Sequence, residues 1–288
     1  MIGITGASGQ LGRLVLNELL KTTPATELVA LARDPAKLSD YAARGVQVRA
    51  ADYNAPATLG AALVGVDRLL LISSSEIGQR LPQHRAVIQA AVAAGVKLLA
   101  YTSLLHADRS QLGLAQEHRD TEALLHASGL PFVLLRNGWY TENYAASIAP
   151  ALQHGAFIGS AEEGRIASAA RADYAAAAAQ VLITPGHAGK VYELAGDAAY
   201  TLADFAAEIS RQSGKAVPYV NLPQADFEAA LNGAGLPGPL SALLADSDAA
   251  AARGALFDDG HALSQLIGRP TTPYAETVRA SVAAVTAA

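Results

Sequence analysis

Short apolar runs alternate with segments of helical periodicity along the first half of the chain. The apolar runs occupy residues 2–5, 27–33, 46–50, 67–72, 96–103 and 131–136. Segments 13–21, 56–63, 82–94 and 114–128 lie between them, and Gly95 and Gly129 end the last two as glycine ends helices. This alternation predicts an α/β fold, a doubly wound parallel sheet covered by helices on both faces.

The alternation becomes less regular after Asn137. We expect helices at 142–154, 174–183, 202–213, 223–232, 240–251 and 259–267, and extended segments at 155–160, 190–194 and 216–221. Thr201 is expected to cap the helix at 202–213, and Gly214 to end it. The prediction is a dinucleotide-binding domain at 1–136, with returning segments near 170–195, and a smaller substrate-side α/β lobe at 137–288.

A glycine-rich turn joins the first strand to the first helix. Its residues are Gly6, Ala7, Ser8, Gly9, Gln10, Leu11 and Gly12. Gly6 would allow the tight turn, Gly9 a close approach to a pyrophosphate, and Gly12 close packing of the helix on the strand. Backbone N–H groups at the helix N-terminus would then face the anion. The spacing is G-x-x-G-x-x-G, so a tight turn without a ligand is the alternative.

A basic residue follows the second strand. An acid at this position bonds the ribose 2′-hydroxyl of NAD, whereas a base accommodates the 2′-phosphate of NADP. Arg33 therefore favours NADP(H). Asp34, which could face the ribose if the loop turned differently, and an ordinary surface role for Arg33 are the alternatives.

Polar residues also follow other strands. Ser73, Ser74 and Ser75 end the fourth strand and could line the ribose and diphosphate, or form only a serine turn. Asp52 follows the third strand, where it could meet the adenine or be a solvated loop acid. His118 and Glu122 are four residues apart on one helix face, as either an orienting pair beside the nicotinamide or a solvated or structural pair.

The segment after the sixth strand concentrates aromatic and amide side chains. It contains Asn137, Gly138, Trp139, Tyr140, Thr141, Glu142, Asn143 and Tyr144. Such groups suit a flat ligand or the nicotinamide, although a structural aromatic anchor between lobes explains them equally well. Further on, Arg171 belongs to the predicted cofactor site and Asp173 is a candidate cap of the next helix.

Composition excludes several classes of protein. The 288 residues carry a net charge of −5 without a basic block, which argues against nucleic acid as a main partner. No cysteine is present, so thiolate catalysis, iron–sulfur clusters and zinc–thiolate sites are excluded. The seven histidines lack metal-ligand spacing, and no Gly-x-Ser-x-Gly elbow supports a hydrolase. With the first strand beginning at Ile2 and no apolar run long enough to span a bilayer, we expect a cytoplasmic protein.

Taken together, these residues resemble the NmrA-like atypical short-chain dehydrogenases, and within them the bacterial NADPH-dependent quinone oxidoreductases. The matching stretches are 4–12, 33–37, 69–76, 100–108, 135–144, 170–178 and 256–259. The resemblance implies a Rossmann domain with a small C-terminal lobe. It also implies NADPH bound by the glycine turn, Arg33, Ser73–Ser75 and Asn137–Glu142, and a quinone site near Tyr140 and Asn143.

The expected activity is direct hydride transfer from the nicotinamide to a quinone, without flavin or metal. The Tyr-x-x-x-Lys pair of short-chain dehydrogenases is missing, and an electron-poor quinone needs less help from a general acid than a ketone does. No catalytic side chain is therefore assigned. The alternatives are an NADP(H)-binding redox sensor without turnover and a reductase of a dye, azo or nitro compound. Exposed alanine-rich helices could support a homodimer.

Overall fold

The computed structural model describes residues 1–287. Its strands are β1 Ile2–Ile4, β2 Leu28–Ala32, β3 Gln47–Ala50, β4 Arg68–Leu71, β5 Leu98–Leu104, β6 Phe132–Asn137, β7 Phe157–Gly159, β8 Val191–Leu194 and β9 Tyr219–Asn221. Its α-helices are α1 Gln10–Leu19, α2 Ser39–Ala43, α3 Ala57–Ala62, α4 Arg80–Ala93, α5 Ala115–Ala127, α6 Thr141–Ala145, α7 Ile148–His154, α8 Arg171–Ile183, α9 Leu202–Ser213, α10 Gln224–Gly233, α11 Gly238–Ala251, α12 Ala262–Ile267 and α13 Tyr274–Thr286. Two short 3₁₀ helices precede and follow β2, at Ala25–Glu27 and Pro35–Leu38.

Seven strands form one sheet in the order β3-β2-β1-β4-β5-β6-β8. The pairs from β3 to β6 are parallel, and β1 lies between β2 and β4, with Gly3 opposite both Val29 and Leu69. The chain builds outward from β1 to β3 and then crosses to β4 on the other side of β1. This reversal of strand order opens a crevice at the carboxyl ends of β1 and β4, where ligands of such sheets bind.

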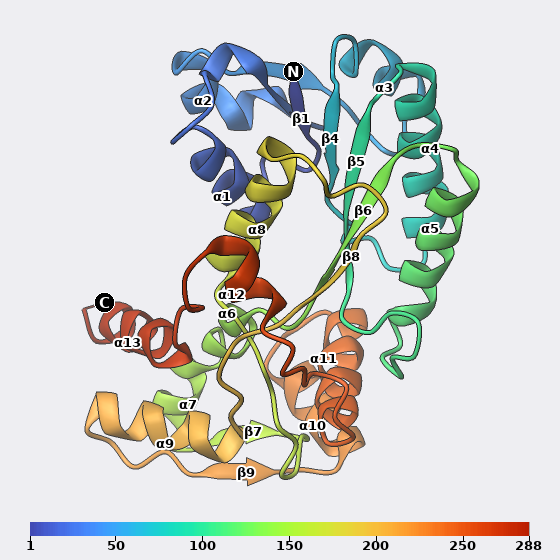
Figure 1. Cartoon of the computed structure of the whole chain (residues 1–288). Coiled ribbons are helices and arrows are strands. Elements are labelled where there is room, and N and C mark those ends of the chain that lie inside the picture. Colours follow the sequence, from blue (N-terminus) through green and yellow to red (C-terminus); the bar gives the residue numbers. More distant parts are fainter. Residues whose placement is uncertain (288) are drawn as a thin grey trace. The chain divides into compact units, whose positions relative to one another are not determined.

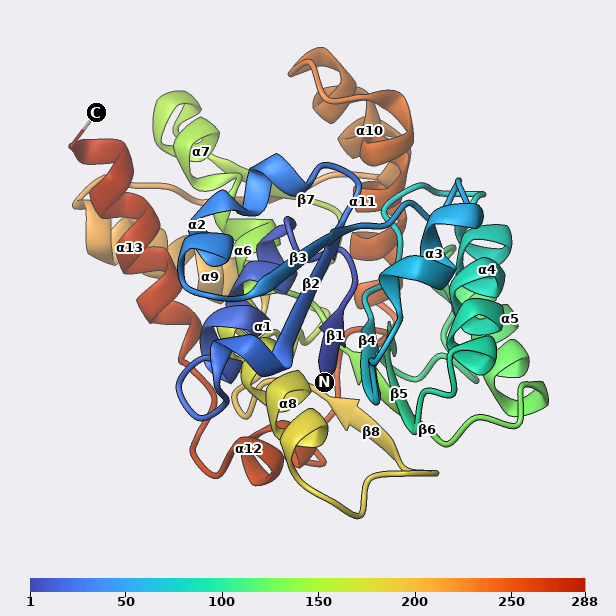
Figure 2. The ribbon, with the colours of Figure 1, turned by 90° about the horizontal axis from the view of Figure 1, so that it is seen from above.

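The chain divides into two compact units. The first comprises Met1–Ala107, Gln116–Asn137 and Ala172–Tyr192, and the second Asp108–Ala115, Gly138–Arg171 and the chain from Glu193 onward. In the first unit α1 and α8 lie on one face of the sheet and α3, α4 and α5 on the other (Figures 1 and 2). Every side chain of β2 is buried, as expected for a strand covered on both faces.

The second unit contains a separate pair of parallel strands, β7 and β9. Its core includes an aromatic cluster in which the ring centroids of Phe157 and Phe205 are 5.4 Å apart and those of Tyr200 and Tyr274 are 4.2 Å apart. A buried carboxylate lies beside this cluster. Asp248 on α11 accepts hydrogen bonds from the Tyr144 hydroxyl at 2.8 Å and the Ser160 N–H at 2.9 Å.

Asp248 makes the second unit less stable at neutral than at acidic pH. Burial raises the pKa of Asp248 from 3.8 to about 6, against the lowering effect of its two hydrogen bonds. The protonated carboxyl contributes fully to the free energy of unfolding below pH 3.8. This contribution is lost as the pH rises through 6, a loss of about 2–3 kcal/mol. Urea titrations at several pH values should show that the free energy of unfolding of the wild type falls by about 2–3 kcal/mol relative to that of Asp248→Asn between pH 4 and pH 7. A difference that stays constant would contradict the prediction.

The predicted elements agree with the structure, except for small differences in their ends, in most of the chain. Thr201 caps α9 with a capping box, and Gly214 ends that helix in a left-handed conformation, as predicted. The helix predicted at 142–154 is wrong as one element: it is α6 and α7, because Pro150 has no N–H to donate to Ala146. Helix α13 was not predicted.

Two other expectations at α8 are corrected. Asp173 does not cap this helix from outside, because α8 begins at Arg171 and Asp173 lies inside its first turn. The alanines Ala175, Ala177, Ala178 and Ala179 are buried, so α8 offers no exposed alanine face for a dimer. Within residues 1–287, none of the helices combines the length and apolar character needed to cross a bilayer.

Candidate functional site

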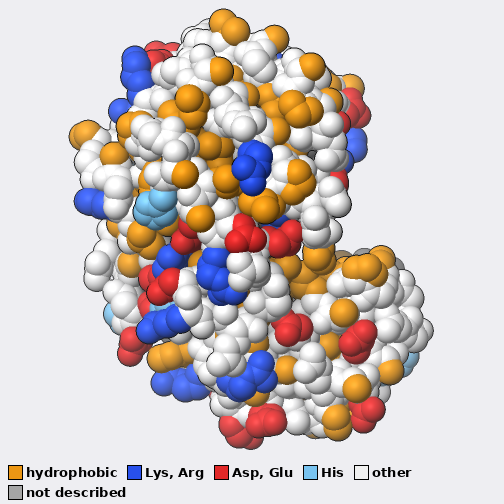
Figure 3. Space-filling model, turned by 90° about the vertical axis from the view of Figure 1, so that its right-hand side faces the viewer, with side chains coloured by type: hydrophobic (Ala, Val, Ile, Leu, Met, Phe, Trp, Pro, Cys, Tyr) orange, Lys and Arg blue, Asp and Glu red, His pale blue; other side chains and the backbone are white. Residues whose placement is uncertain are grey.

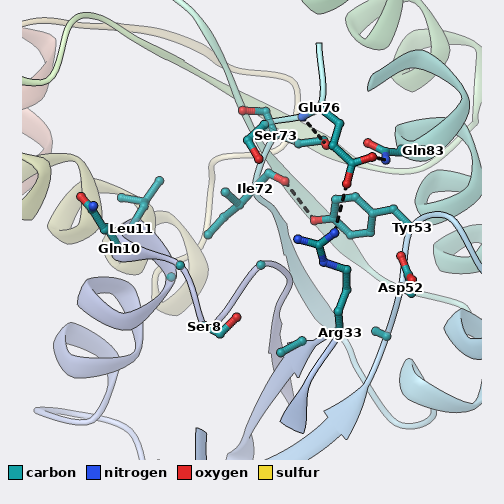
Figure 4. A pocket seen from close by; sticks show the side chains of 17 residues that line it. Ser8, Gln10, Leu11, Arg33, Asp52, Tyr53, Ile72, Ser73, Glu76 and Gln83 are labelled. Carbon is teal, nitrogen blue, oxygen red and sulfur yellow. Dashed lines mark hydrogen bonds and ion pairs between the residues drawn. The ribbon is translucent and has the colours of Figure 1, made fainter. Parts of the chain in front are cut away.

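A pocket of about 290 Å³ lies at the carboxyl ends of the strands, entirely within the first unit (Figure 4). The turn after β1 forms one wall, and the segments after β2, β3 and β4 and one residue of α4 complete it. Its lining is Gly6, Ser8, Gly9, Gln10, Leu11, Gly12, Ala32, Arg33, Ala51, Asp52, Tyr53, Ile72, Ser73, Ser74, Ser75, Glu76 and Gln83. The strand order changes direction here, so this is the predicted ligand position.

A second hollow, on the outer side of α4 and α5, differs in character. It is lined by Arg85, Ile88, Gln89, Val92, Leu124, Ala127 and Ser128. The side of the molecule that Figure 3 shows, where α4 and α5 lie, carries several hydrophobic side chains among scattered charged ones. This groove lacks glycine-rich backbone, and so the pocket at the strand ends is the candidate nucleotide site.

The glycine turn has the geometry that its sequence predicts. Gly6 has φ +58°, a left-handed conformation that glycine adopts without strain. A Cβ on Gly12 would lie 2.5 Å from the Gly6 carbonyl oxygen and 2.7 Å from the Ala7 Cα, so only glycine lets α1 approach this closely. The turn therefore leaves an open cradle in front of the α1 N-terminus.

Not every N–H group of the turn faces the cradle. The Ala7 N–H donates to the Leu31 carbonyl and the Gly9 N–H to the Gly6 carbonyl. Ala7 is completely buried and does not line the pocket, unlike the other six residues of the predicted turn. The N–H groups of Gln10, Leu11 and Gly12 form the first turn of α1, which has no intrahelical acceptors for them. Of the N–H groups in the predicted turn, those at the start of α1 are therefore the ones available to an anion.

Side chains from several elements hold the backbone that follows β4. The Ile72 N–H donates to Thr5 Oγ1 at 3.0 Å, and the Tyr53 hydroxyl lies 2.9 Å from the Ile72 carbonyl oxygen. The Ser73 N–H donates to Thr102 Oγ1 at 2.9 Å. Residues 72–73 are therefore fixed by neighbouring strands and loops.

Two side chains of α4 bind the backbone of Ser74, one at its N–H and one at its carbonyl. The Ser74 N–H donates to His84 Nε2 at 2.9 Å, and Arg80 Nε donates to the Ser74 carbonyl at 2.6 Å. Arg80 is buried and ion-paired with Glu117 of α5 at 2.7 Å. The backbone of Ser73 and Ser74 is thus held by side chains of α4 and β5 where the segment lines the pocket.

The role of His84 fixes its tautomer. Nε2 accepts from Ser74, so Nδ1 carries the proton and donates to Thr121 Oγ1, 2.9 Å away. Burial, helped by the charge of Arg80, lowers the pKa of His84 to about 3. The imidazole is therefore neutral at physiological pH and serves as an acceptor for the loop.

Removing the His84 ring should loosen the pocket. We expect His84→Ala to weaken NADPH binding about tenfold, because the buried Ser74 N–H loses its acceptor, at a cost of about 1–3 kcal/mol. The exposed His126 of α5 lies outside the pocket, and His126→Ala is the matched control. Equal NADPH dissociation constants for the two variants would contradict the prediction.

Arg33 and Glu76 meet at the rim of the pocket (Figure 4). Arg33 Nη1 lies 3.1 Å from Glu76 Oε1, and the side chains are 68% and 38% exposed. Glu76 Oε2 also accepts from Gln83 Nε2 at 2.8 Å and Asn54 Nδ2 at 3.2 Å. The guanidinium is consequently placed where the segments after β2 and β4 converge.

The two aspartates near this rim differ. Asp34 Oδ1 accepts from the Ala36 N–H and caps the short 3₁₀ helix, and Asp34 does not line the pocket. This arrangement disfavours the alternative in which Asp34 faces the ribose. Asp52 does line the pocket, and its Oδ1 accepts from the Asn54 N–H at 2.9 Å.

Four other predicted residues meet one another in the second unit. Both carboxylate oxygens of Glu142 accept from the Arg171 N–H, at 2.9 and 3.1 Å. The Arg171 guanidinium donates to Asn143 Oδ1 at 3.2 Å and lies over the Tyr140 ring, 4.5 Å from its centroid. Asn143 and Tyr140 are partly exposed. The predicted quinone contacts thus share Arg171 as a neighbour.

The remaining residues of the segment after β6 are mostly buried. Trp139 is 8% exposed and its ring lies 5.8 Å from that of Tyr144. Thr141 is completely buried, within hydrogen-bonding distance of Ser168 Oγ. Gly138 donates its N–H to Leu194, and Asn137, which ends β6 in the first unit, is 6% exposed.

His118 and Glu122 are buried rather than solvated. His118 Nδ1 is 2.8 Å from the Tyr101 hydroxyl, and burial lowers the pKa of His118 to about 3. Glu122 is ion-paired with Arg136 at 2.7 Å and accepts from Ser103 Oγ at 2.5 Å. Each residue thus connects α5 to the sheet.

Several lining residues were not predicted from the sequence. Tyr53, Glu76 and Gln83 contribute side chains to the pocket. Tyr53 and Glu76 follow the ends of β3 and β4, a position that could have indicated them. Gln83 lies within α4, and no local pattern singles it out.

Known proteins share this architecture. A family model described as NAD(P)H-binding matches residues 6–185, which contain the whole pocket. The chain belongs to the NAD(P)H-binding family. Within residues 1–287, no group of three or more histidine, aspartate or glutamate side chains is arranged to hold a metal ion.

Relatives of this NAD(P)H-binding protein extend over nearly its full length. Quinone oxidoreductase 2 of Escherichia coli (strain K12) is 62% identical over 96% of this chain and 97% of the relative. The crystal structure of the NADPH-dependent quinone oxidoreductase from E. coli, complexed with NADPH, matches with a TM-score of 0.95 over 96% of this chain and 98% of that one. Triphenylmethane reductase of Citrobacter sp., complexed with NADP(H), is 36% identical with a TM-score of 0.93 over 98% and 100% of the two chains. The nicotinamide-cofactor family predicted from the sequence is therefore confirmed.

Proposed function

We propose that the chain is an NADPH-dependent quinone reductase. The observation that carries the proposal is the pocket at the strand reversal, with Arg33 at its rim, in a chain 62% identical to quinone oxidoreductase 2. Three features of the pocket suit the cofactor: a glycine turn in which Gly12 lets α1 pack closely against the Gly6–Ala7 backbone, N–H groups at the start of that helix, and a cation beside the ribose position.

The residues of the chain would mainly bind and orient. The α1 start would hold the pyrophosphate, Arg33 the 2′-phosphate, and Ser73–Ser75 the ribose and diphosphate. The proposed cofactor contacts also include Asn137 of the first unit and Gly138–Glu142 and Arg171 of the second, and the proposed quinone contacts are Tyr140 and Asn143. NADPH supplies a hydride to the quinone, which takes a proton from solvent to give the hydroquinone. Proximity and orientation then provide most of the acceleration, without flavin.

Turnover with a benzoquinone tests the proposal. The purified protein, shown by its absorbance to carry no flavin, is mixed with NADPH and the quinone, and NADPH oxidation is followed against a blank without protein. Steady oxidation well above the blank is expected. Binding of NADPH without any such oxidation would indicate a redox sensor instead.

A dye reductase is the second candidate, favoured by the 36% identity to triphenylmethane reductase. A panel of quinones, triphenylmethane dyes and azo compounds separates the two. We expect kcat/KM for the best quinone to exceed that for any dye by about tenfold or more. A higher kcat/KM for a dye would instead support a dye reductase. We also propose that the protein is cytoplasmic and can form a homodimer, through a surface other than the buried alanines of α8; cell fractionation and light scattering would test the two points.

His118 should contribute little to the chemistry. Its imidazole is neutral well above pH 3 and is hydrogen-bonded to the Tyr101 hydroxyl. We therefore expect His118→Ala to lower kcat per folded protein by less than about tenfold. A loss of about a thousandfold, the scale of a true general acid, would contradict this view. Circular dichroism of the variant gives the folded fraction.

A further inference from the structure

The rim of the pocket is poor in positive charge for a site that takes a dinucleotide phosphate. Among the described lining residues Arg33 is the only cation, whereas Asp52 and Glu76 are both acids. The 2′-phosphate that distinguishes NADPH from NADH adds a charge of about −1.5 to −2. Glu76 already occupies one face of the guanidinium that would receive that phosphate.

Glu76 is the fixed partner in this ion pair. Its carboxylate has donors from three parts of the chain, Arg33, Asn54 and Gln83, and its own N–H donates to Ser74 Oγ at 3.1 Å. Arg33 is the more exposed side chain, at 68%. When a phosphate approaches, the guanidinium can therefore turn toward it while the carboxylate stays in place.

Gln83 shows how strongly the carboxylate is held. This side chain is 2% exposed, and its Nε2 donates to both Glu76 and Asn54. Within the described chain its buried Oε1 has no hydrogen-bond partner. Both amide protons are directed at the Glu76–Asn54 side, although the amide oxygen stays unsatisfied. The rim is thus arranged around a negative charge.

We propose that Glu76 is a specificity-determining residue that limits the preference of the pocket for NADPH over NADH. The inference rests on the proposed NADPH site and concerns only the balance between the two cofactors. A phosphate bonded to Arg33 lies within a few ångströms of the Glu76 carboxylate and is repelled by it. The 2′-hydroxyl of NADH carries no charge and is not repelled.

Two effects of Glu76 oppose each other, and repulsion is the larger. An exposed ion pair that orients Arg33 improves phosphate binding by at most about fivefold. At close range the carboxylate repels a nearly doubly charged phosphate. This repulsion weakens phosphate binding by more than about tenfold, even with the dielectric constant of a protein surface. The net effect of removing the charge is therefore a gain in NADPH selectivity.

Glu76→Gln tests the proposal through binding alone. Calorimetry gives the dissociation constants of NADPH and NADH, and their ratio should shift by more than about twofold toward NADPH at low ionic strength. The shift should shrink in 0.5 M salt, where the screening length falls below about 5 Å. Glu76→Asp keeps the charge and should leave the ratio close to that of the wild type.

Asp34→Asn is the matched control. It removes the same charge next to Arg33 in sequence, outside the pocket, and asparagine caps a helix as well as aspartate does. Its ratio should change less than twofold. An unchanged or lowered NADPH preference in Glu76→Gln would overturn the proposal for Glu76, whereas failure of the wild type to bind NADPH would instead overturn the proposed function.

Discussion

Replacing Arg33 with aspartate is expected to weaken NADPH binding about a hundredfold and to leave NADH binding within about threefold of the wild type. A charge-assisted bond to the 2′-phosphate contributes about 1.5–3 kcal/mol, and the new carboxylate repels the phosphate. A hundredfold loss corresponds to about 2.7 kcal/mol, which is within this range. An aspartate at the end of β2 can also accept from the 2′-hydroxyl of NADH.

The control for this charge reversal is Arg85→Asp. Arg85 is an exposed residue of α4 in the same unit and does not line the pocket. Calorimetric titration of both variants with both cofactors separates a local from a general electrostatic effect. Equal losses for NADPH and NADH in Arg33→Asp would show that Arg33 does not contact the 2′-phosphate.

Replacing Glu122 with glutamine is expected to destabilise the protein by about 3 kcal/mol. The Glu122–Arg136 pair connects α5 to β6, and its side chains are only 9% and 11% exposed. Removing one partner of a buried pair leaves the other charge inside the protein without its counter-ion. Ser103 Oγ, 2.5 Å from the carboxylate, also loses its charged acceptor.

The matched control is Glu18→Gln. Glu18 of α1 pairs with Lys21, two residues beyond the end of that helix, where the lysine side chain is 64% exposed, and such pairs contribute less than about 1 kcal/mol. Urea titration gives the free energy of unfolding of each variant. If Glu122→Gln cost no more than Glu18→Gln, the buried pair would have no special role in stability.

The sequence predicted the fold well where periodicity and turn chemistry agree. Strands β1–β6 and four of the helices between them were placed because the hydrophobic period changes from strand to helix, and Gly95 and Gly129 mark two of the helix ends. The single helix predicted at 142–154 failed because the effect of Pro150 acts one turn earlier, on the carbonyl of Ala146. Helix α13 was not recognised, although Val278 and Val282 are buried at helical spacing.

The candidate site was only partly predictable. The glycine turn, Arg33 and Ser73–Ser75 were accessible because strand ends of a parallel sheet converge at one edge. Gln83, which lines the pocket, and His84 and Arg80, which bind the Ser74 backbone, were not accessible. All three lie on α4, and which face of a helix meets a loop depends on tertiary packing. The spacing of His118 and Glu122 left an orienting, a solvated and a structural pair open, and could not show that each is buried against a different residue of the sheet.

The hydrogen bonds that hold residues 72–74 bear on the thermodynamics of association. Thr5, Tyr53, Thr102, His84 and Arg80 restrain this backbone through hydrogen bonds from the protein itself. A segment that is already ordered loses little conformational entropy when a ligand docks against it. More of the interaction energy is then retained as affinity, and the nucleotide can be exchanged in each catalytic cycle without refolding the loop.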